Sequence, residues 1–189
     1  DAMNTFFGLP AHPLLVHVPV VLIPLCLVGA ILMALKPDWR QHLLVPTTAL
    51  TIAGALGAIL AAQAGEWLQE QVPENSLVHD HAELGEMARN LAILFAGAMF
   101  VWCLRELSKK RGWFADTTLG RLLQARWVGV AAISGALLLG SASTFFVIRA
   151  GHTGAKSAWQ EKVGGHRDLP RGDGTWNPPA GFHPDDDSN

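Results

Sequence analysis

Four long apolar stretches without charged side chains dominate the chain. Lys, Arg, Asp and Glu are absent from residues 2–35, 41–65, 90–104 and 127–148. A charge-free apolar run of about 18 residues or more is typical of a helix that crosses a bilayer, whose hydrocarbon core is roughly 30 Å thick. The third run is shorter, so a span that ends near Leu104 must begin near Glu86. The pattern predicts an integral membrane protein with several spans.

The apolar runs predict an all-α fold, a four-helix transmembrane bundle. The expected helices cover about 12–35, 43–65, 82–105 and 127–150. Strands are not expected, because the runs are too long and because open-edged backbone facing lipid would leave its polar groups unpaired. Pro19 and Pro24 predict a kink in the first helix, since each proline removes a backbone hydrogen bond. Small residues in the second and fourth helices predict close helix packing.

The end of the chain differs in composition from the rest. We expect a membrane domain over 1–156 and an extended polar tail over 157–189, where Gly, Pro and Asp are frequent. Such a segment buries too little apolar surface to fold alone, so we expect the tail to lie on other membrane-protein subunits. Large aromatic residues dominate interface energetics, and the expected partner contacts are Trp159, Trp176 and Phe182.

The charges of the loops predict the orientation in the membrane. The turn 36–42 and the loop 105–126 are rich in Lys and Arg, whereas the loop 66–85 has acidic residues and no basic ones. The positive-inside rule puts the basic loops in the cytoplasm, so both termini are expected to be extracytoplasmic. The expected location is the cytoplasmic (inner) membrane of a bacterium. The net charge of −2, with no basic block, argues against nucleic-acid binding.

Histidines are the main candidate ligands. In this topology all of the eight except His42 lie on the outer side. Counting about 20 residues per span puts His12, His81 and His152 at one level on three helices, with His17 at the membrane boundary. Ring nitrogens that converge from several helices are what a bundle-held heme or metal needs. His17 and His81 are the expected leading ligands of heme b, with His12 and His152 as a second pair or as residues of the outer shell.

Other residues beside these histidines fit either a heme or a metal ion. Arg149 lies three residues before His152, where its cation could bind a heme propionate. The alternative to heme is a single transition-metal ion held by His12, His17, His81 and His152, to which the carboxylates of Glu83 and Glu86 could add ligands. A third possibility is no cofactor, because histidines at a membrane interface also cap helices and bind water. Glu86 and Arg89 are expected to form a pair at the membrane surface.

Three segments resemble a known family. The stretch GLPAHPLLVHVPVVLIPL (8–25) contains an HPxxVHxP pattern at His12, Pro13, His17 and Pro19, and it resembles the opening of the bacterial domain-of-unknown-function family twenty-two thirty-one. HAELGEMA (81–88) and GHTGA (151–155) resemble later parts of that family, so the likeness covers about 6–156. The first motif looks actinobacterial. The resemblance implies a four-helix membrane protein in membrane electron transfer, with heme as a cofactor, and it carries no catalytic residue.

Two functions compete at this point. The first is an integral membrane subunit of a respiratory or other electron-transfer complex that binds heme b or a metal ion. The second is a cofactor-free accessory subunit that stabilises a larger membrane complex through its helices and tail. A transporter is disfavoured, because no charge interrupts the middle of the first, second or fourth helix. The chain has no nucleophile–base motif, so we do not expect it to be catalytic on its own.

Overall fold

The computed structural model describes residues 5–6, 9–70, 76–112, 114 and 116–164, with side chains described between 11 and 156 except at 71–77, 113 and 115. Its elements in chain order are β1 (Thr5–Phe6), β2 (Leu9–Pro10), α1 (Ala11–Leu15), α2 (His17–Leu35), the 3-10 turn η1 (Pro37–Trp39), α3 (Arg40–Gln69), α4 (Ser76–Arg111), α5 (Thr118–Gln124) and α6 (Arg126–Gly164). The two short strands pair antiparallel, with Thr5 opposite Pro10.

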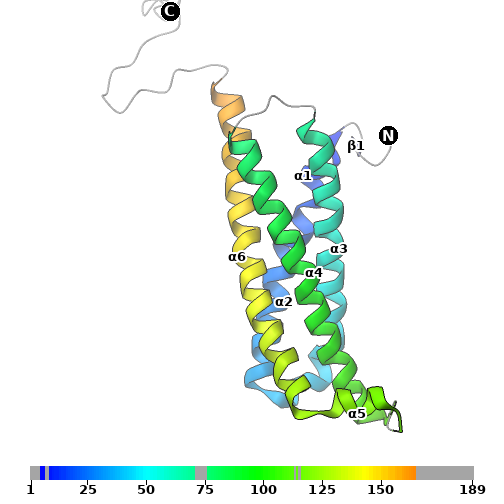
Figure 1. The fold of residues 1–189 in the computed structure, drawn as a ribbon. Helices are drawn as coiled ribbons and strands as arrows, with labels where there is room; N and C mark the ends of the chain where they lie inside the picture. Colours follow the sequence, from blue (N-terminus) through cyan, green and yellow to red (C-terminus); the bar gives the residue numbers. More distant parts are fainter. Residues whose placement is uncertain (1–4, 7–8, 71–75, 113, 115, 165–189) are drawn as a thin grey trace, which may run out of the picture.

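Four long helices run side by side as a bundle (Figure 1). Within the described residues, four helical segments are long and apolar enough to cross a membrane: 11–35, 37–69, 78–111 and 126–156. The predicted all-α, four-helix fold is therefore confirmed. The strands β1 and β2 are the departure from it, since no strand was expected.

Three helices are longer than the sequence predicted. Helix α3 covers Arg40–Gln69 instead of 43–65. Helix α4 begins at Ser76 and ends at Arg111, whereas 82–105 was expected, and α6 continues to Gly164 instead of ending near 150. The first residues of the predicted extended tail, 157–164, are therefore helical. The prediction followed the apolar length needed to cross the bilayer. A helix can continue past that length, because its backbone hydrogen bonds are made within the segment.

Proline interrupts the first span where the chain enters the bundle. The helix stops at Leu15 and resumes at His17, with Val16 between them. The break lies one turn before Pro19, whose ring clashes with the carbonyl of Leu15 and whose nitrogen has no hydrogen to donate to it. The helical assignment is thus interrupted before Pro19, while Val16 itself keeps helical angles (φ −63°, ψ −23°), and Pro24 lies inside α2.

The core combines large side chains with glycine contacts. Phe95, Met99 and Trp102 of α4 are fully buried and follow one helix face. A Cβ added at Gly140 of α6 would lie 3.0 Å from the Phe95 ring, and one at Gly57 of α3 would overlap Val18 of α2. The small residues of the second and fourth helices therefore do allow close packing, as their sequence indicated.

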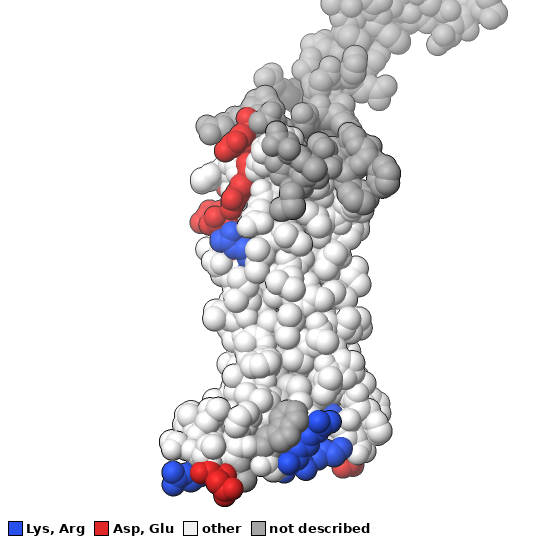
Figure 2. All heavy atoms as spheres, turned by 90° about the vertical axis from the view of Figure 1, so that its right-hand side faces the viewer, with Lys and Arg blue, Asp and Glu red and all other residues white. Residues whose placement is uncertain are grey.

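The two ends of the bundle carry different side chains. Helix α1 begins and α6 ends at one end, which we call the histidine end, whereas α5 and the turn between α2 and α3 lie at the other (Figure 1). We call this second end the basic end. Figure 2 shows acidic side chains at the histidine end and most of the visible basic ones at the basic end. The exposed or half-exposed basic residues there are Lys36, Arg40, Lys109, Lys110, Arg111, Arg121 and Arg126, and the buried Arg105 lies against Gly129 at the same end.

Candidate functional site

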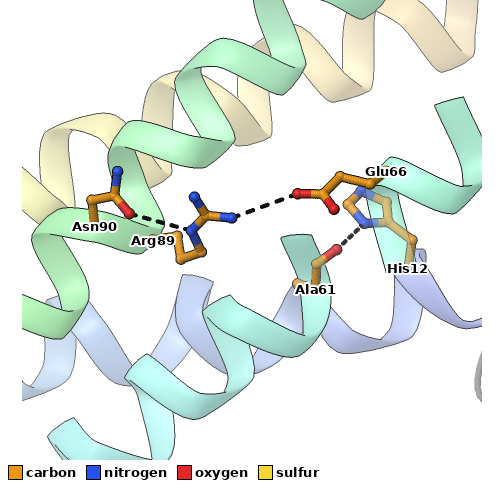
Figure 3. Close-up of polar contacts among 5 residues, drawn as sticks. All are labelled: His12, Ala61, Glu66, Arg89 and Asn90. Carbon is orange, nitrogen blue, oxygen red and sulfur yellow. Dashed lines mark hydrogen bonds and ion pairs between the residues drawn. The ribbon is translucent and has the colours of Figure 1, made fainter. Parts of the chain in front are cut away.

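His12 is held in place by the backbone of a neighbouring helix. Its Nδ1 lies 2.7 Å from the carbonyl oxygen of Ala61 in α3 (Figure 3). A carbonyl only accepts hydrogen bonds, so Nδ1 must carry the proton and donate it. One turn further along α3, a Cβ added at Gly65 would lie 2.9 Å from the His12 ring. Glycine at 65 therefore gives the half-buried imidazole its space.

His81 is held in the same way by a different helix. Its Nδ1 donates to the carbonyl oxygen of Ala150 in α6 at 2.9 Å, and the hydroxyl of Thr153 lies 3.4 Å from the same nitrogen. A Cβ added at Gly154 would lie 2.8 Å from Cε1 of His81. The two histidines thus have the same surroundings: each donates its Nδ1 proton to a backbone carbonyl of a neighbouring helix, and each ring packs against a glycine of that helix.

The two imidazoles contact each other at the histidine end. Their ring centroids are 5.8 Å apart and their planes meet at 83°. When the rings are neutral, each Nε2 carries a free lone pair, because Nδ1 holds the proton. Two imidazole nitrogens that each bind one ion at about 2.0–2.1 Å lie no more than about 4 Å apart, which puts their ring centroids about 5–6 Å apart. The 5.8 Å between the centroids of His12 and His81 lies in this range, and it is equally that of an ordinary edge-to-face contact between two rings.

The other two candidate histidines are not brought to this pair. His17 is exposed on α2, and its Nδ1 donates to the carbonyl oxygen of Pro13, 2.7 Å away in the preceding helical segment. His152 is exposed on α6. It lies two residues, about 200°, around that helix from Ala150, which accepts the His81 bond. The ring beside His81 is therefore that of His12, and the expected pairing of His81 with His17 is not observed.

The remaining candidates lie around the pair without joining it. Arg149 is exposed, with its guanidinium carbon 5.9 Å from the centroid of the Phe145 ring of its own helix. Glu83 and Glu86 are exposed on α4. Within the described part of the chain, no group of three or more His, Cys, Asp and Glu side chains is arranged to hold a metal ion. Of the expected partner contacts, Trp159 is described only as helical backbone, and Trp176 and Phe182 lie outside the described residues.

An ion pair links α3 and α4 next to His12. The Arg89 guanidinium lies 3.6 Å from a Glu66 carboxylate oxygen, and its Nε donates to the Asn90 side chain at 3.3 Å (Figure 3). The sequence predicted a pair with Glu86 on the same helix, whereas the carboxylate paired with Arg89 is that of Glu66. The Glu66 side chain is 62% exposed, so the pair contributes about 0–1 kcal/mol to stability.

Sequence reasoning missed the groups that orient the two rings. The carbonyl oxygens of Ala61 and Ala150 carry no sequence signature, because every residue has one. Gly65 and Gly154 are visible in the sequence, and Gly154 is part of the GHTGA stretch. A small residue in a long helix can indicate a close approach, but the residue that approaches it depends on how the helices pack.

The fold and the site define a multi-pass membrane protein with a histidine pair at one end. The sequence profile of a family described as "Predicted membrane protein (DUF2231)" matches residues 8–167. This match covers most of the chain and includes both His12 and His81. The protein therefore belongs to the DUF2231 family of membrane proteins, which confirms the resemblance of its motifs. Searches of curated proteins and of solved structures give no significant match.

Proposed function

We propose that this protein is an integral membrane subunit that holds a transition-metal ion between His12 and His81, in an electron-transfer assembly. The observation that carries the proposal is the pair of Nδ1–H bonds to the carbonyls of Ala61 and Ala150. Histidine ligands of metals almost always donate their other ring N–H in this way, which fixes the tautomer and makes Nε2 the ligand. Imidazole nitrogens suit zinc, copper, iron and nickel.

A single ion suits the surroundings of the two rings better than heme b does. A porphyrin extends several Å beyond its iron on every side and needs a flat slot between its axial ligands and their neighbours. The backbones of α3 and α6 lie against the two rings at Gly65 and Gly154, and they occupy part of that space. An ion needs only the free Nε2 atoms, and its remaining ligands would come from water or from another molecule.

The electron-transfer role rests on the family resemblance of the His12–His17 motif, which implies membrane redox assemblies. An ion at one end of the bundle would lie near the surface of the membrane, where a soluble redox domain can reach it. The bundle would supply rigidity, because glycine contacts such as that of Gly140 with Phe95 hold its helices close together.

The accessory role remains the second candidate, and the same two hydrogen bonds favour it. His12 connects α1 to α3, and His81 connects α4 to α6. Each bond satisfies a polar ring while it fastens two helices, and it would do so without an ion. In this role the two histidines stabilise the bundle through hydrogen bonds between its helices, and the bundle in turn stabilises a larger membrane complex.

Metal binding by the purified full-length protein separates these roles. The protein is stripped with a chelator in detergent, titrated with Zn²⁺, Cu²⁺ or Co²⁺, and its metal content and affinity are measured. We expect one ion per chain. His12→Ala or His81→Ala should weaken binding by more than about 100-fold, because loss of an outer partner of a ligand alone costs about 10–100-fold.

The controls for this titration are His17→Ala and His152→Ala, which remove exposed histidines and should leave the affinity unchanged. Equal metal binding by the parent and both pair variants, with lower melting temperatures for His12→Ala and His81→Ala, would favour the accessory role. A Soret band in the optical spectrum of the purified protein, lost in the same two variants, would show that the occupant is heme.

A further inference from the structure

A shallow hollow lies on α6 at the basic end, far along the bundle from the histidine pair. It is lined by Arg126, Trp127, Val130, Ala131 and Ser134. Successive residues of this set are one or three positions apart, so they form one strip about 12 Å long on one helix face. The opposite face, with Val128, Gly129 and Ala132, is buried in the bundle. The strip therefore faces outward, toward the lipid that surrounds a membrane-spanning helix.

The two ends of this strip differ in chemistry. Arg126 lies at the start of α6 with its cationic side chain exposed, and the rest of the strip is apolar except for Ser134. Among the described residues the ion pairs join Arg89 to Glu66 and Arg105 to Glu106. Arg126 thus places a cation at one end of an apolar strip, and no acidic side chain of the described residues pairs with it.

The surroundings of Arg126 favour a negatively charged occupant. The basic end carries seven exposed or half-exposed Lys and Arg side chains, and its described acidic residues are Asp38, Glu106 and Asp116. Such an excess of positive charge attracts anions. Trp127 is 65% exposed beside Arg126, and indole rings prefer the headgroup level of a membrane.

We infer that the strip binds a phospholipid with a net anionic headgroup. The Arg126 guanidinium holds the phosphate, and one acyl chain lies along Trp127, Val130 and Ala131. A membrane lipid fits better than an extended protein segment, because such a segment would bring unpaired backbone groups into the hydrocarbon layer. The strip is also continuous with the apolar outer face of α6, where Leu138 is 71% exposed.

Lipid retention by the full-length protein tests this inference. The protein is equilibrated with an equimolar mixture of phosphatidylglycerol and phosphatidylcholine of the same acyl chains, and the bound lipid is counted by native mass spectrometry. We expect phosphatidylglycerol to be retained in preference. Arg126→Gln should reduce that preference about fivefold, the effect of removing one basic residue near an anionic membrane surface.

Two further variants make the test specific. Ala131→Phe should fill the hollow and lower the retention of both lipids without changing any charge. Arg121→Gln removes an exposed cation of the same end that does not line the hollow, and it should leave the preference unchanged. If Arg126→Gln fails to fold, the retention of lipid by the Ala131→Phe variant tests whether the hollow is the binding site. Equal retention of both lipids by the parent protein, or an equal loss in Arg121→Gln and Arg126→Gln, would overturn the inference.

Discussion

His12 and His81 owe their orientation to the backbone of neighbouring helices. Each ring gives its Nδ1 proton to a carbonyl, at 2.7 and 2.9 Å. An α-helix normally uses its carbonyls for its own hydrogen bonds, so each acceptor serves the ring with its second lone pair. Each ring is thereby fixed in one tautomer with Nε2 free.

We expect Gly154→Ala to disturb the His81 ring. The added Cβ would lie 2.8 Å from Cε1 of His81, so the ring must shift and the bond to Ala150 must weaken. Overpacking of this kind costs about 1–3 kcal/mol. The measurement is the thermal unfolding of the purified protein in detergent, together with its metal affinity.

The matched control for that variant is Gly151→Ala in the same helix. A Cβ there meets nothing within 4 Å, and alanine is the better helix former by about 1 kcal/mol, so this variant should be as stable as the parent or slightly more so. If the Gly154→Ala and Gly151→Ala variants had the same melting temperature, the close approach of α6 to His81 would be refuted.

At the level of elements, the short helix α5 is set by a tight turn after α4. Gly112 and Phe114 have φ angles of +66° and +62°, and a positive φ is uncommon for any residue except glycine. Thr117 caps α5, because its side-chain oxygen accepts the backbone N–H of Gly120 at 3.1 Å. The turn and the cap together direct the chain from α4 into α6.

Gly120→Ala should release α5 from this turn. A Cβ at 120 would overlap the carbonyl oxygen of Phe114, and that overlap can be relieved only by moving the backbone. We expect faster cleavage by trypsin at Arg111 or Arg121, measured by limited proteolysis, with the four long helices intact. Gly97→Ala in α4 meets nothing within 4 Å and should be cleaved at the parent rate. An equal rate in Gly120→Ala would contradict the tight contact.

Across the whole molecule, charge separates the two ends of the bundle. Most of the visible basic side chains lie at the basic end together with a few acidic ones, and the other visible acidic side chains lie at the histidine end (Figure 2). Both α1 and the end of α6 lie at the histidine end (Figure 1). The positive-inside rule then predicts that the basic end faces the cytoplasm.

Cysteine labelling in intact cells tests this orientation. Lys110→Cys and Lys156→Cys replace exposed residues at opposite ends, and the native Cys26 and Cys103 are buried. An impermeant thiol reagent should label the cysteine at 156 and leave the one at 110 unlabelled until the cells are opened. The reverse pattern of labelling would put the basic end outside.

The local composition of the chain determined several features of the fold. The number of spanning helices, the proline break and the difference in charge between the two ends all follow from short stretches of the chain. Each depends on properties such as apolar length, a missing N–H or the count of Lys and Arg, which hold whatever the neighbours are. The helix ends beyond the apolar runs were less predictable, because the length of an apolar run reflects the thickness of the bilayer and not the full length of the helix.

Only the tertiary structure decided which histidines meet. His12 bonds a carbonyl 49 positions away and His81 one 69 positions away, so their partners depend on how each helix is rotated against the next. The sequence predicted His17 at the membrane boundary and His152 at the level of His12 and His81, whereas the structure leaves the side chains of both His17 and His152 exposed. The depth of a residue in the membrane follows from its position along a helix and can be estimated from the sequence. The direction in which its side chain points depends on how the helices pack, and only this packing brings His12 and His81 together.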